Sequence, residues 1–90
     1  MATVFIPTPM RKFTQNKSRI SLAAGTVAAL FAELEQSCPG VSAQIYDAEG
    51  AIKRYINVFV NGKDIRNLAG VQTPVEDRDD VYIVPAMAGG

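Results

Sequence analysis

Residues 55–62 read Tyr55-Ile56-Asn57-Val58-Phe59-Val60-Asn61-Gly62, and this stretch decides the fold. All but one of its first six residues are β-branched or aromatic, the types that favour strands. The Asn61-Gly62 pair accepts the positive φ angles of a two-residue hairpin turn. The stretch therefore predicts a strand that doubles back at Asn61-Gly62.

An amphipathic helix is predicted before this strand. Its apolar stripe falls at i, i+3, i+4 and i+7, namely Val27, Leu30, Phe31 and Leu34. Thr26 offers a hydroxyl N-cap after the break at Gly25. Cys38-Pro39-Gly40 predicts a helix end near Ser37, because the residue before proline avoids the helical region and glycine commonly ends helices. Residues 41–46 predict a further helical turn.

The remaining strands lie towards the two ends of the chain. Val4-Phe5-Ile6 is a short apolar strand stopped by Pro7, and Arg19-Ile20-Ser21-Leu22 alternates as a half-buried strand does. We expect these two to pair antiparallel around a polar connection at 10–17. Residues 70–74 predict a loop and 76–80 a turn, before a last strand, Val81-Tyr82-Ile83-Val84, that ends at Pro85.

This order of elements predicts an α+β fold of the β-grasp (ubiquitin-like) type. A mixed sheet of about four to five strands, covered by one main helix, buries every apolar stripe. A ferredoxin-like fold ranks second, because it needs another full helix where residues 64–80 hold many turn formers. We expect residues 1–85 to form the domain and residues 86–90 a flexible C-terminal tail.

Alternation along the strands assigns two faces to the sheet, since every second residue shares a side. The face towards the helix takes Val4, Ile6, Ile56, Val58, Val60, Val81 and Ile83. The other face takes four aromatic residues, Phe5, Tyr55, Phe59 and Tyr82. These rings either reflect strand propensity under partial loop cover or form a patch that binds a partner.

The composition excludes some classes of function but does not identify the function. Ninety residues make one domain, and nine basic against nine acidic residues give no field that would attract nucleic acid or a membrane surface. The charges are segregated, however, with only basic residues before Glu33 and four acids around Arg78. Two explanations fit this segregation of charge: the charged segments are solvated loops, or they are docking surfaces of opposite sign.

An enzyme centred on Cys38 is the least favoured function. The chain has no histidine to serve as its base, and a helix C-terminus does not stabilise a thiolate. One cysteine without histidine also cannot assemble a zinc site, so no metal is expected. A lone cysteine and no leader or membrane-spanning run favour a cytoplasmic protein that is a monomer by itself.

The last five residues, Ala86-Met87-Ala88-Gly89-Gly90, suggest where the chemistry lies. Small residues after Pro85 have little to pack against, so we expect them to project and stay mobile. Two glycines make a narrow tail that fits another protein's active site. The Gly90 carboxylate is then the reacting group, activated by adenylation in a partner, while Ala86, Met87, Ala88 and Gly89 are read by that partner.

The chain resembles the ubiquitin-like sulfur carriers of thiamin and molybdopterin synthesis (the ThiS/MoaD type). The resemblance rests on the Gly-Thr-Val-Ala-Ala-Leu helix start, Pro39-Gly40, residues 55–62, Asp64-Ile65-Arg66 and the Pro-Ala-Met-Ala-Gly-Gly ending. Within the family, the Phe-Ile-Pro-Thr-Pro start, the long 10–18 loop and the ending look most like the carrier for cysteine biosynthesis from O-phosphoserine. The family also places an Asp-x-Arg like Asp64–Arg66 near its partner interface, so Arg66 is a candidate, although a solvated loop arginine is an equal explanation.

The resemblance implies a reaction cycle shared with partners. An E1-like enzyme adenylates Gly90, a sulfur donor makes the thiocarboxylate, a pyridoxal-phosphate cysteine synthase accepts the sulfur, and a zinc metallopeptidase releases cysteine. ATP, pyridoxal phosphate and zinc belong to those partners, and this chain itself binds no cofactor. The alternatives are a small subunit docked in the large subunit of molybdopterin synthase, a thiamin carrier, or a ubiquitin-like modifier conjugated to lysines.

Overall fold

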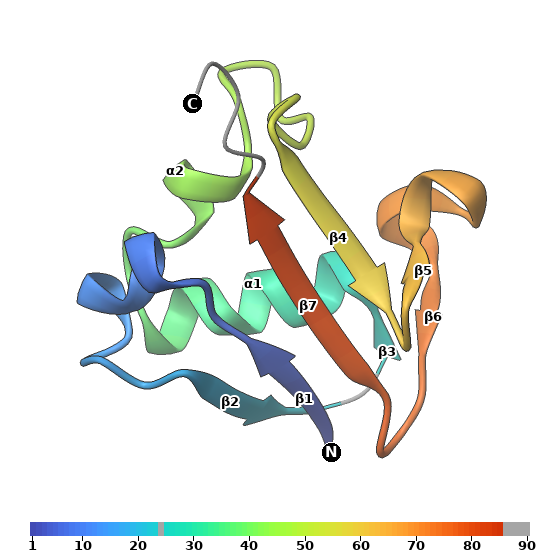
Figure 1. Ribbon diagram of the computed structural model, residues 1–90, viewed down its shortest axis with the longest axis horizontal. Coiled ribbons are helices and arrows are strands. Elements are labelled where there is room, and N and C mark those ends of the chain that lie inside the picture. Colours follow the sequence, from blue (N-terminus) through green and yellow to red (C-terminus); the bar gives the residue numbers. More distant parts are fainter. Residues whose placement is uncertain (24, 86–90) are drawn as a thin grey trace.

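The computed structural model describes residues 1–23 and 25–85. Five strands of this part form one sheet in the order β2-β1-β7-β4-β5, with bounds β1 Ala2–Phe5, β2 Arg19–Leu22, β4 Ile56–Val60, β5 Lys63–Asp64 and β7 Asp80–Pro85 (Figure 1). Two shorter strands, β3 (Gly25–Thr26) and β6 (Pro74–Val75), pair with each other. The helix α1 (Val27–Ser37) crosses one face of the sheet, and a short helix α2 (Ser42–Ile45) follows it. The predicted β-grasp arrangement is confirmed.

The C-terminal strand β7 occupies the middle of the sheet. It runs parallel to β1, with Val4 opposite Val81, and antiparallel to β4, with Val58 opposite Ile83. The predicted hairpin of β1 and β2 is antiparallel, with Val4 opposite Ile20. The sheet is therefore mixed, as predicted.

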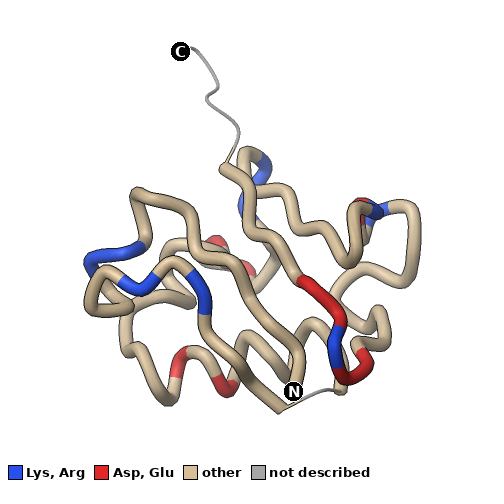
Figure 2. The backbone as a smooth tube through the Cα atoms, turned by 60° about the horizontal axis from the view of Figure 1, so that its bottom comes forward, with Lys and Arg blue, Asp and Glu red and all other residues tan. Residues whose placement is uncertain are grey.

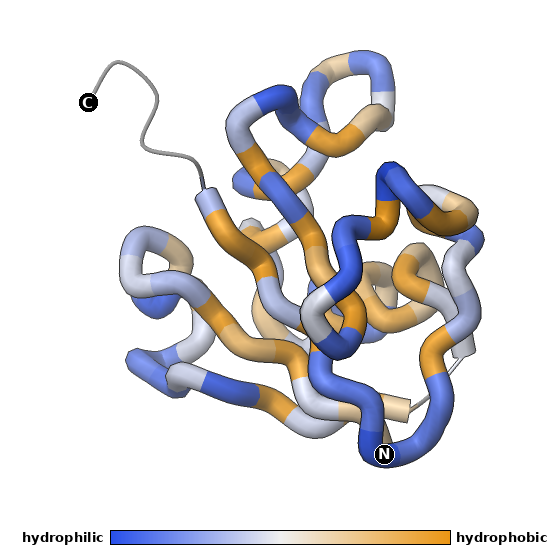
Figure 3. The backbone as a smooth tube through the Cα atoms, turned by 45° about the vertical axis from the view of Figure 1, so that its right-hand side comes forward, coloured by the Kyte–Doolittle hydropathy of each residue, from blue (hydrophilic) through white to orange (hydrophobic). Residues whose placement is uncertain are grey.

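The core lies between α1 and the inner face of the sheet. The four predicted stripe residues of α1 are all buried, and so are all seven strand residues assigned to this face. Thr26 caps α1, because its hydroxyl accepts a hydrogen bond from the Ala29 amide at 3.1 Å. Figure 3 shows hydrophobic residues alternating with polar ones along the strands, while the turns are mostly hydrophilic. Periodicity alone assigned these eleven core residues correctly.

The hairpin turn between β4 and β5 also follows its prediction. Asn61 and Gly62 take φ angles of 52° and 86°, which is the left-handed region that such a turn needs. Val60 and Lys63 pair across it. The strand itself starts at Ile56, one residue later than predicted.

Two predicted loops were wrong in detail. The connection at 10–17 begins as a 3₁₀ helix, Thr8–Phe13, that buries Met10, and it also buries Thr14. Thr14 is polar but satisfied, since its hydroxyl bonds to the Arg11 and Lys17 carbonyls. Residues 70–74 hold a 3₁₀ helix, Gly70–Gln72, and the start of β6. A third 3₁₀ helix, Ile65–Asn67, follows β5. Each of the three 3₁₀ helices contacts the core, because Met10 and Ile65 belong to it and Val71 packs against it.

The connection after α1 is held by Glu35. Its carboxylate accepts hydrogen bonds from the backbone amides of Ser42, at 2.8 Å, and Gly40, at 3.1 and 3.2 Å. These amides, that of Ser42 first, lower the pKa of Glu35 below its ordinary value of 4.5. Glu35 thus ties the end of α1 to the start of α2.

Glycine is required at position 40 for two reasons. Its φ angle is +103°, and a Cβ built there would lie 2.8 Å from the Phe13 ring. We expect Gly40→Ala to cost about 1–2 kcal/mol for the backbone and about 1–3 kcal/mol for the clash. Gly50→Ala is the matched control, since Gly50 has φ +82° with nothing within 4 Å of its Cβ position. Urea unfolding measures the free energy of unfolding of both variants, and an equal decrease in the two would contradict the clash with Phe13.

The Glu35 hydrogen bonds predict a dependence of stability on pH. Because the folded-state pKa is lowered, the stabilisation is fully present above the ordinary pKa of 4.5 and is lost as the pH falls through the lowered value. Glu35→Gln should therefore be less stable than wild type at neutral pH, and the difference should shrink in acid. Urea unfolding across this range measures it, with the exposed Glu49→Gln as control. A difference that stays constant with pH would refute the role of the charge.

Candidate functional site

Three aromatic residues form a row across the outer face of the sheet. Phe5 on β1 lies opposite Tyr82 on β7, and Tyr82 lies opposite Phe59 on β4. The rings of Phe5 and Tyr82 stack with centroids 4.4 Å apart and planes 8° apart. We call Phe5, Tyr82 and Phe59 the aromatic row.

The aromatic row is accessible from solvent. Tyr82 is 38% exposed and Val84, two residues along β7, is 41% exposed, while Phe5 and Phe59 are half-buried. The helix α1 lies on the other side of the sheet (Figure 1). Large apolar side chains on an uncovered face favour a surface that binds a partner.

Tyr55, the fourth predicted aromatic, lies outside this row. It precedes β4 and is 47% exposed, with the Lys53 ammonium 5.8 Å from its ring centroid. The structure therefore places Tyr55 at the other end of β4 from the Asn61-Gly62 turn. It extends the accessible surface towards the end of β7, where Pro85 lies opposite Ile56.

Arg66 is fixed at the edge of the outer face. Its guanidinium bonds to Asp64 with an Nη2–Oδ2 distance of 2.9 Å, and it also donates to Asn57 Oδ1. Asp64 lies opposite Phe59, so Arg66 lies beside the aromatic row. The hydrogen bond from Arg66 is the main reason that the pKa of Asp64 is lowered. Arg66 is thus an ordered cation at the predicted place, and its role towards a partner stays a prediction.

The tail that is predicted to carry the chemistry lies outside the described residues. This applies to Ala86, Met87, Ala88, Gly89 and Gly90, the last of which is the predicted reacting position. The structure does define where that tail begins. Pro85 ends the central strand β7 and lies opposite Ile56, the first residue of β4.

The segregated charges lie at opposite ends of β1. The basic residues of 11–19 follow its end, and the acidic turn at 76–80 lies beside its start (Figure 2). The acidic turn is partly structural. Asp77 pairs with the Met1 ammonium at 3.0 Å, and Asp79 accepts from the Glu76 amide at 2.8 Å and from Asn61 at 2.9 Å. These bonds, that of Glu76 first, lower the pKa of Asp79.

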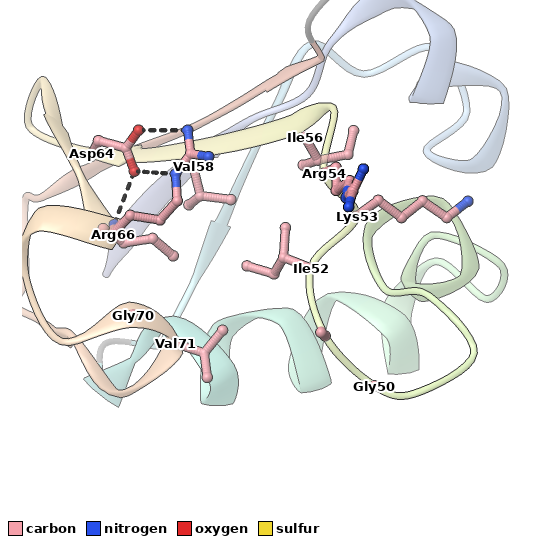
Figure 4. A pocket seen from close by; sticks show the side chains of 12 residues that line it. Gly50, Ile52, Lys53, Arg54, Ile56, Val58, Asp64, Arg66, Gly70 and Val71 are labelled. Carbon is pink, nitrogen blue, oxygen red and sulfur yellow. Dashed lines mark hydrogen bonds and ion pairs between the residues drawn. The ribbon is translucent and has the colours of Figure 1, made fainter.

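Sequence reasoning missed a pocket beside β4. Its volume is about 430 Å³, and Figure 4 shows Arg66 on one side of it with Lys53 and Arg54 on the other. The apolar lining comes from β4 and from segments that were expected to be irregular: Ile52, Ile56, Val58, Ile65 and Val71. No periodic signal marks Ile52 and Val71, because each is a single apolar residue in a loop or a short 3₁₀ turn.

Comparisons with known proteins agree with this fold and extend over the tail. The model of the ThiS family matches residues 4–90. The sulfur carrier protein CysO of Mycobacterium tuberculosis is 37% identical over 98% of this chain and 97% of that protein. In the crystal structure of the Amycolatopsis orientalis BexX/CysO complex, one chain matches with a TM-score of 0.93, 34% identity and full coverage of both chains.

The chain is also similar to a protein that is named as a modifier. The small archaeal modifier protein 3 of Haloferax volcanii is 32% identical over 72% of this chain and 70% of that protein. On the question of membranes, the helices of the described residues are all too short or too polar to span a bilayer.

The exposure of Tyr82 predicts how stability responds to its loss. Tyr82→Ser should cost much less than the roughly 3–5 kcal/mol expected for a fully buried aromatic. Phe31→Ala is the matched control, since Phe31 is 1% exposed in the core. Urea unfolding of both variants makes the test. Equal losses would place Tyr82 in the core and remove the argument for an accessible aromatic row.

Proposed function

Because this chain belongs to the ThiS family, we propose that it carries sulfur as a thiocarboxylate on the carboxyl group of Gly90. The observation that carries the proposal is the family match, which runs through Gly89-Gly90. Whole-length similarity to sulfur carrier protein CysO supports the same function. The chain is a carrier and a co-substrate of its partners, not an enzyme.

The chemistry needs activation, because a carboxylate is a poor electrophile. In the proposed cycle a carboxylate oxygen of Gly90 attacks the α-phosphate of ATP in an E1-like enzyme, and pyrophosphate leaves. A sulfide equivalent then attacks the acyl adenylate and AMP leaves, so that one oxygen is replaced by sulfur. Gly89 and Gly90 suit a narrow active-site tunnel since they have no side chains.

The proposed destination of the sulfur is cysteine made from O-phosphoserine. The similarity to CysO over nearly the whole of both chains supports this destination. A pyridoxal-phosphate cysteine synthase would accept the sulfur, and a zinc metallopeptidase would release the product. ATP, pyridoxal phosphate and zinc are all assigned to partners. Molybdopterin synthase and thiamin synthesis remain the alternative acceptors.

Conjugation to proteins is the second candidate function. The observation that favours it is the similarity to small archaeal modifier protein 3. Both functions begin with adenylation of Gly90, after which a lysine amine instead of sulfide would displace AMP. Conjugates of higher mass in cell extract would indicate the modifier.

Docking is assigned to the outer face near the start of the tail. The aromatic row crosses β7 at Tyr82 on the side away from α1, and Arg66 lies at the edge beside this row. Tyr55 precedes Ile56, which lies opposite Pro85 at the end of β7. A partner that covers this face buries apolar rings while Arg66 supplies a directed polar contact. Ala86, Met87 and Ala88 would then lead into its active site.

The tail makes the function directly testable. Purified chain is incubated with ATP, an E1-like enzyme of the same organism and sulfide, and intact mass is measured. Wild type should gain the mass difference between sulfur and oxygen. Deletion of Gly90 should abolish this gain because the carboxylate is displaced by one residue. Gly89→Val should also fail, because a β-branched side chain cannot enter a tunnel shaped for glycine.

Two controls sharpen this experiment. The far-ultraviolet spectrum of the Gly90 deletion should match wild type, which separates loss of function from loss of fold. Addition of O-phosphoserine and a cysteine synthase to the loaded carrier should give a cysteinyl adduct. Sulfur delivery by the Gly90 deletion would refute the carrier assignment, and reaction only with a molybdopterin precursor would refute the cysteine pathway.

A further inference from the structure

The pocket beside β4 adjoins a part of the sheet that has no neighbouring strand. The strand β5 pairs with β4 only at Phe59 and Val60. It ends at Asp64, and the chain then turns into the 3₁₀ helix Ile65–Asn67. At the start of β4 the Ile56 amide donates to the Lys53 carbonyl at 2.9 Å, so the open part of this sheet edge lies at Val58.

The backbone of Val58 faces this open edge. Val60 and Lys63 flank a two-residue turn and so form a hydrogen-bonded pair, and alternation along the strand directs the N–H and C=O of Val58 to the same side. Ile65, which would oppose Val58, uses its carbonyl to accept from the Leu68 amide at 3.0 Å. Among the described residues, no hydrogen bond joins Val58 to another element on this side.

The surroundings of this edge select the kind of segment that would pair with it. On the inner side lies the apolar floor of the pocket, about 430 Å³ in volume. Its lining residues include three cations, Lys53, Arg54 and Arg66, against one carboxylate, Asp64. Asp64 is already paired with Arg66, and Arg54 has no ion pair among the described residues. The opening therefore carries a net positive charge.

We propose that the open edge of β4 at Val58 binds an extended segment of the activating enzyme in which acidic and apolar side chains alternate. Pairing to Val58 supplies backbone hydrogen bonds. Side chains of the bound segment alternate, so one apolar side chain enters the pocket and the acidic side chains on either side of it lie on the outer side, where Arg66 lies. Arg54 and Lys53 meet an acidic side chain at the other end of the opening (Figure 4).

This edge is continuous with the surface assigned to docking. Ile56 lines the pocket and lies opposite Pro85, the residue before the tail. A segment held there would fix the enzyme close to the point where the tail leaves the sheet. The assignment of the segment to the activating enzyme rests on the proposed function, whereas the edge itself is a property of the described structure.

The test titrates a peptide into the full-length, isotopically labelled chain and follows the amide spectrum. The probe is acetyl-Glu-Val-Glu-Leu-Glu-amide, and its control is the same peptide with lysine in place of each glutamate. The acidic peptide should shift the amides of Ile52, Val58 and Val71 with a dissociation constant below about 1 mM. The basic peptide should shift none of them. Shifts confined to β2, the other sheet edge, or equal shifts with both peptides would overturn the proposal.

Matched variants identify the contribution of charge. Arg54→Glu should weaken binding of the acidic peptide at least about fivefold, because attraction at the opening becomes repulsion. Arg19→Glu, an exposed arginine on β2, should leave the affinity unchanged. Both positions are on the surface, and the amide spectrum reports whether each variant is folded. Equal weakening by the two variants would show general charge attraction and overturn the site.

A second assay separates this inference from the proposed function. The Arg54→Glu variant should raise the KM of the adenylating enzyme for this chain at least about fivefold while kcat stays near wild type. If Gly90 acquires sulfur but KM is unchanged, the edge site is wrong and the carrier function stands. If Gly90 is never thiocarboxylated while the peptide binds at Val58, the carrier function is wrong and the edge site stands.

Discussion

The pairing of β7 on both sides, with β1 and with β4, is the constraint on which the rest of the structure depends. Val81 and Ile83 are 0% and 3% exposed, and they place the strand against the core beneath α1. Tyr82 points the other way and joins Phe5 and Phe59. One strand thus builds the core, orders the aromatic row and sets the starting point of the tail at Pro85.

This arrangement suits the proposed carrier function, because the predicted reacting end follows a strand that is paired on both sides. Such a central strand is a firmer base for a tail than an edge strand. The surfaces around Pro85 differ in chemistry. The outer face is aromatic, whereas the open edge of β4 combines an apolar pocket with cations, so two kinds of contact are available next to the same tail.

The sequence predicted those parts of the fold that local patterns specify. The α1 stripe, the Thr26 cap, the Asn61-Gly62 turn and the alternation along β1, β4 and β7 each follow from a short window of residues. The sequence did not predict three features: the 3₁₀ helix Thr8–Phe13, the pairing of β3 with β6, and the pocket beside β4. Met10 belongs to the core and Val71 packs against it, and this core is built from segments far along the chain that no local window contains. Asp64–Arg66 was found only through the family resemblance, and its ordered ion pair came from the structure.

The central claim is that Gly90 carries sulfur, and the most direct measurement is the intact and fragment mass of untagged chain purified from its own organism without oxidants. We expect a fraction heavier by the difference between sulfur and oxygen, with the extra mass on a fragment that contains Gly90 but not Met87. Fragment assignment is needed because oxidation of a methionine adds nearly the same mass, and the chain has three methionines. Extra mass found only on methionine, Met87 included, with Gly90 always a plain carboxylate, would contradict the account.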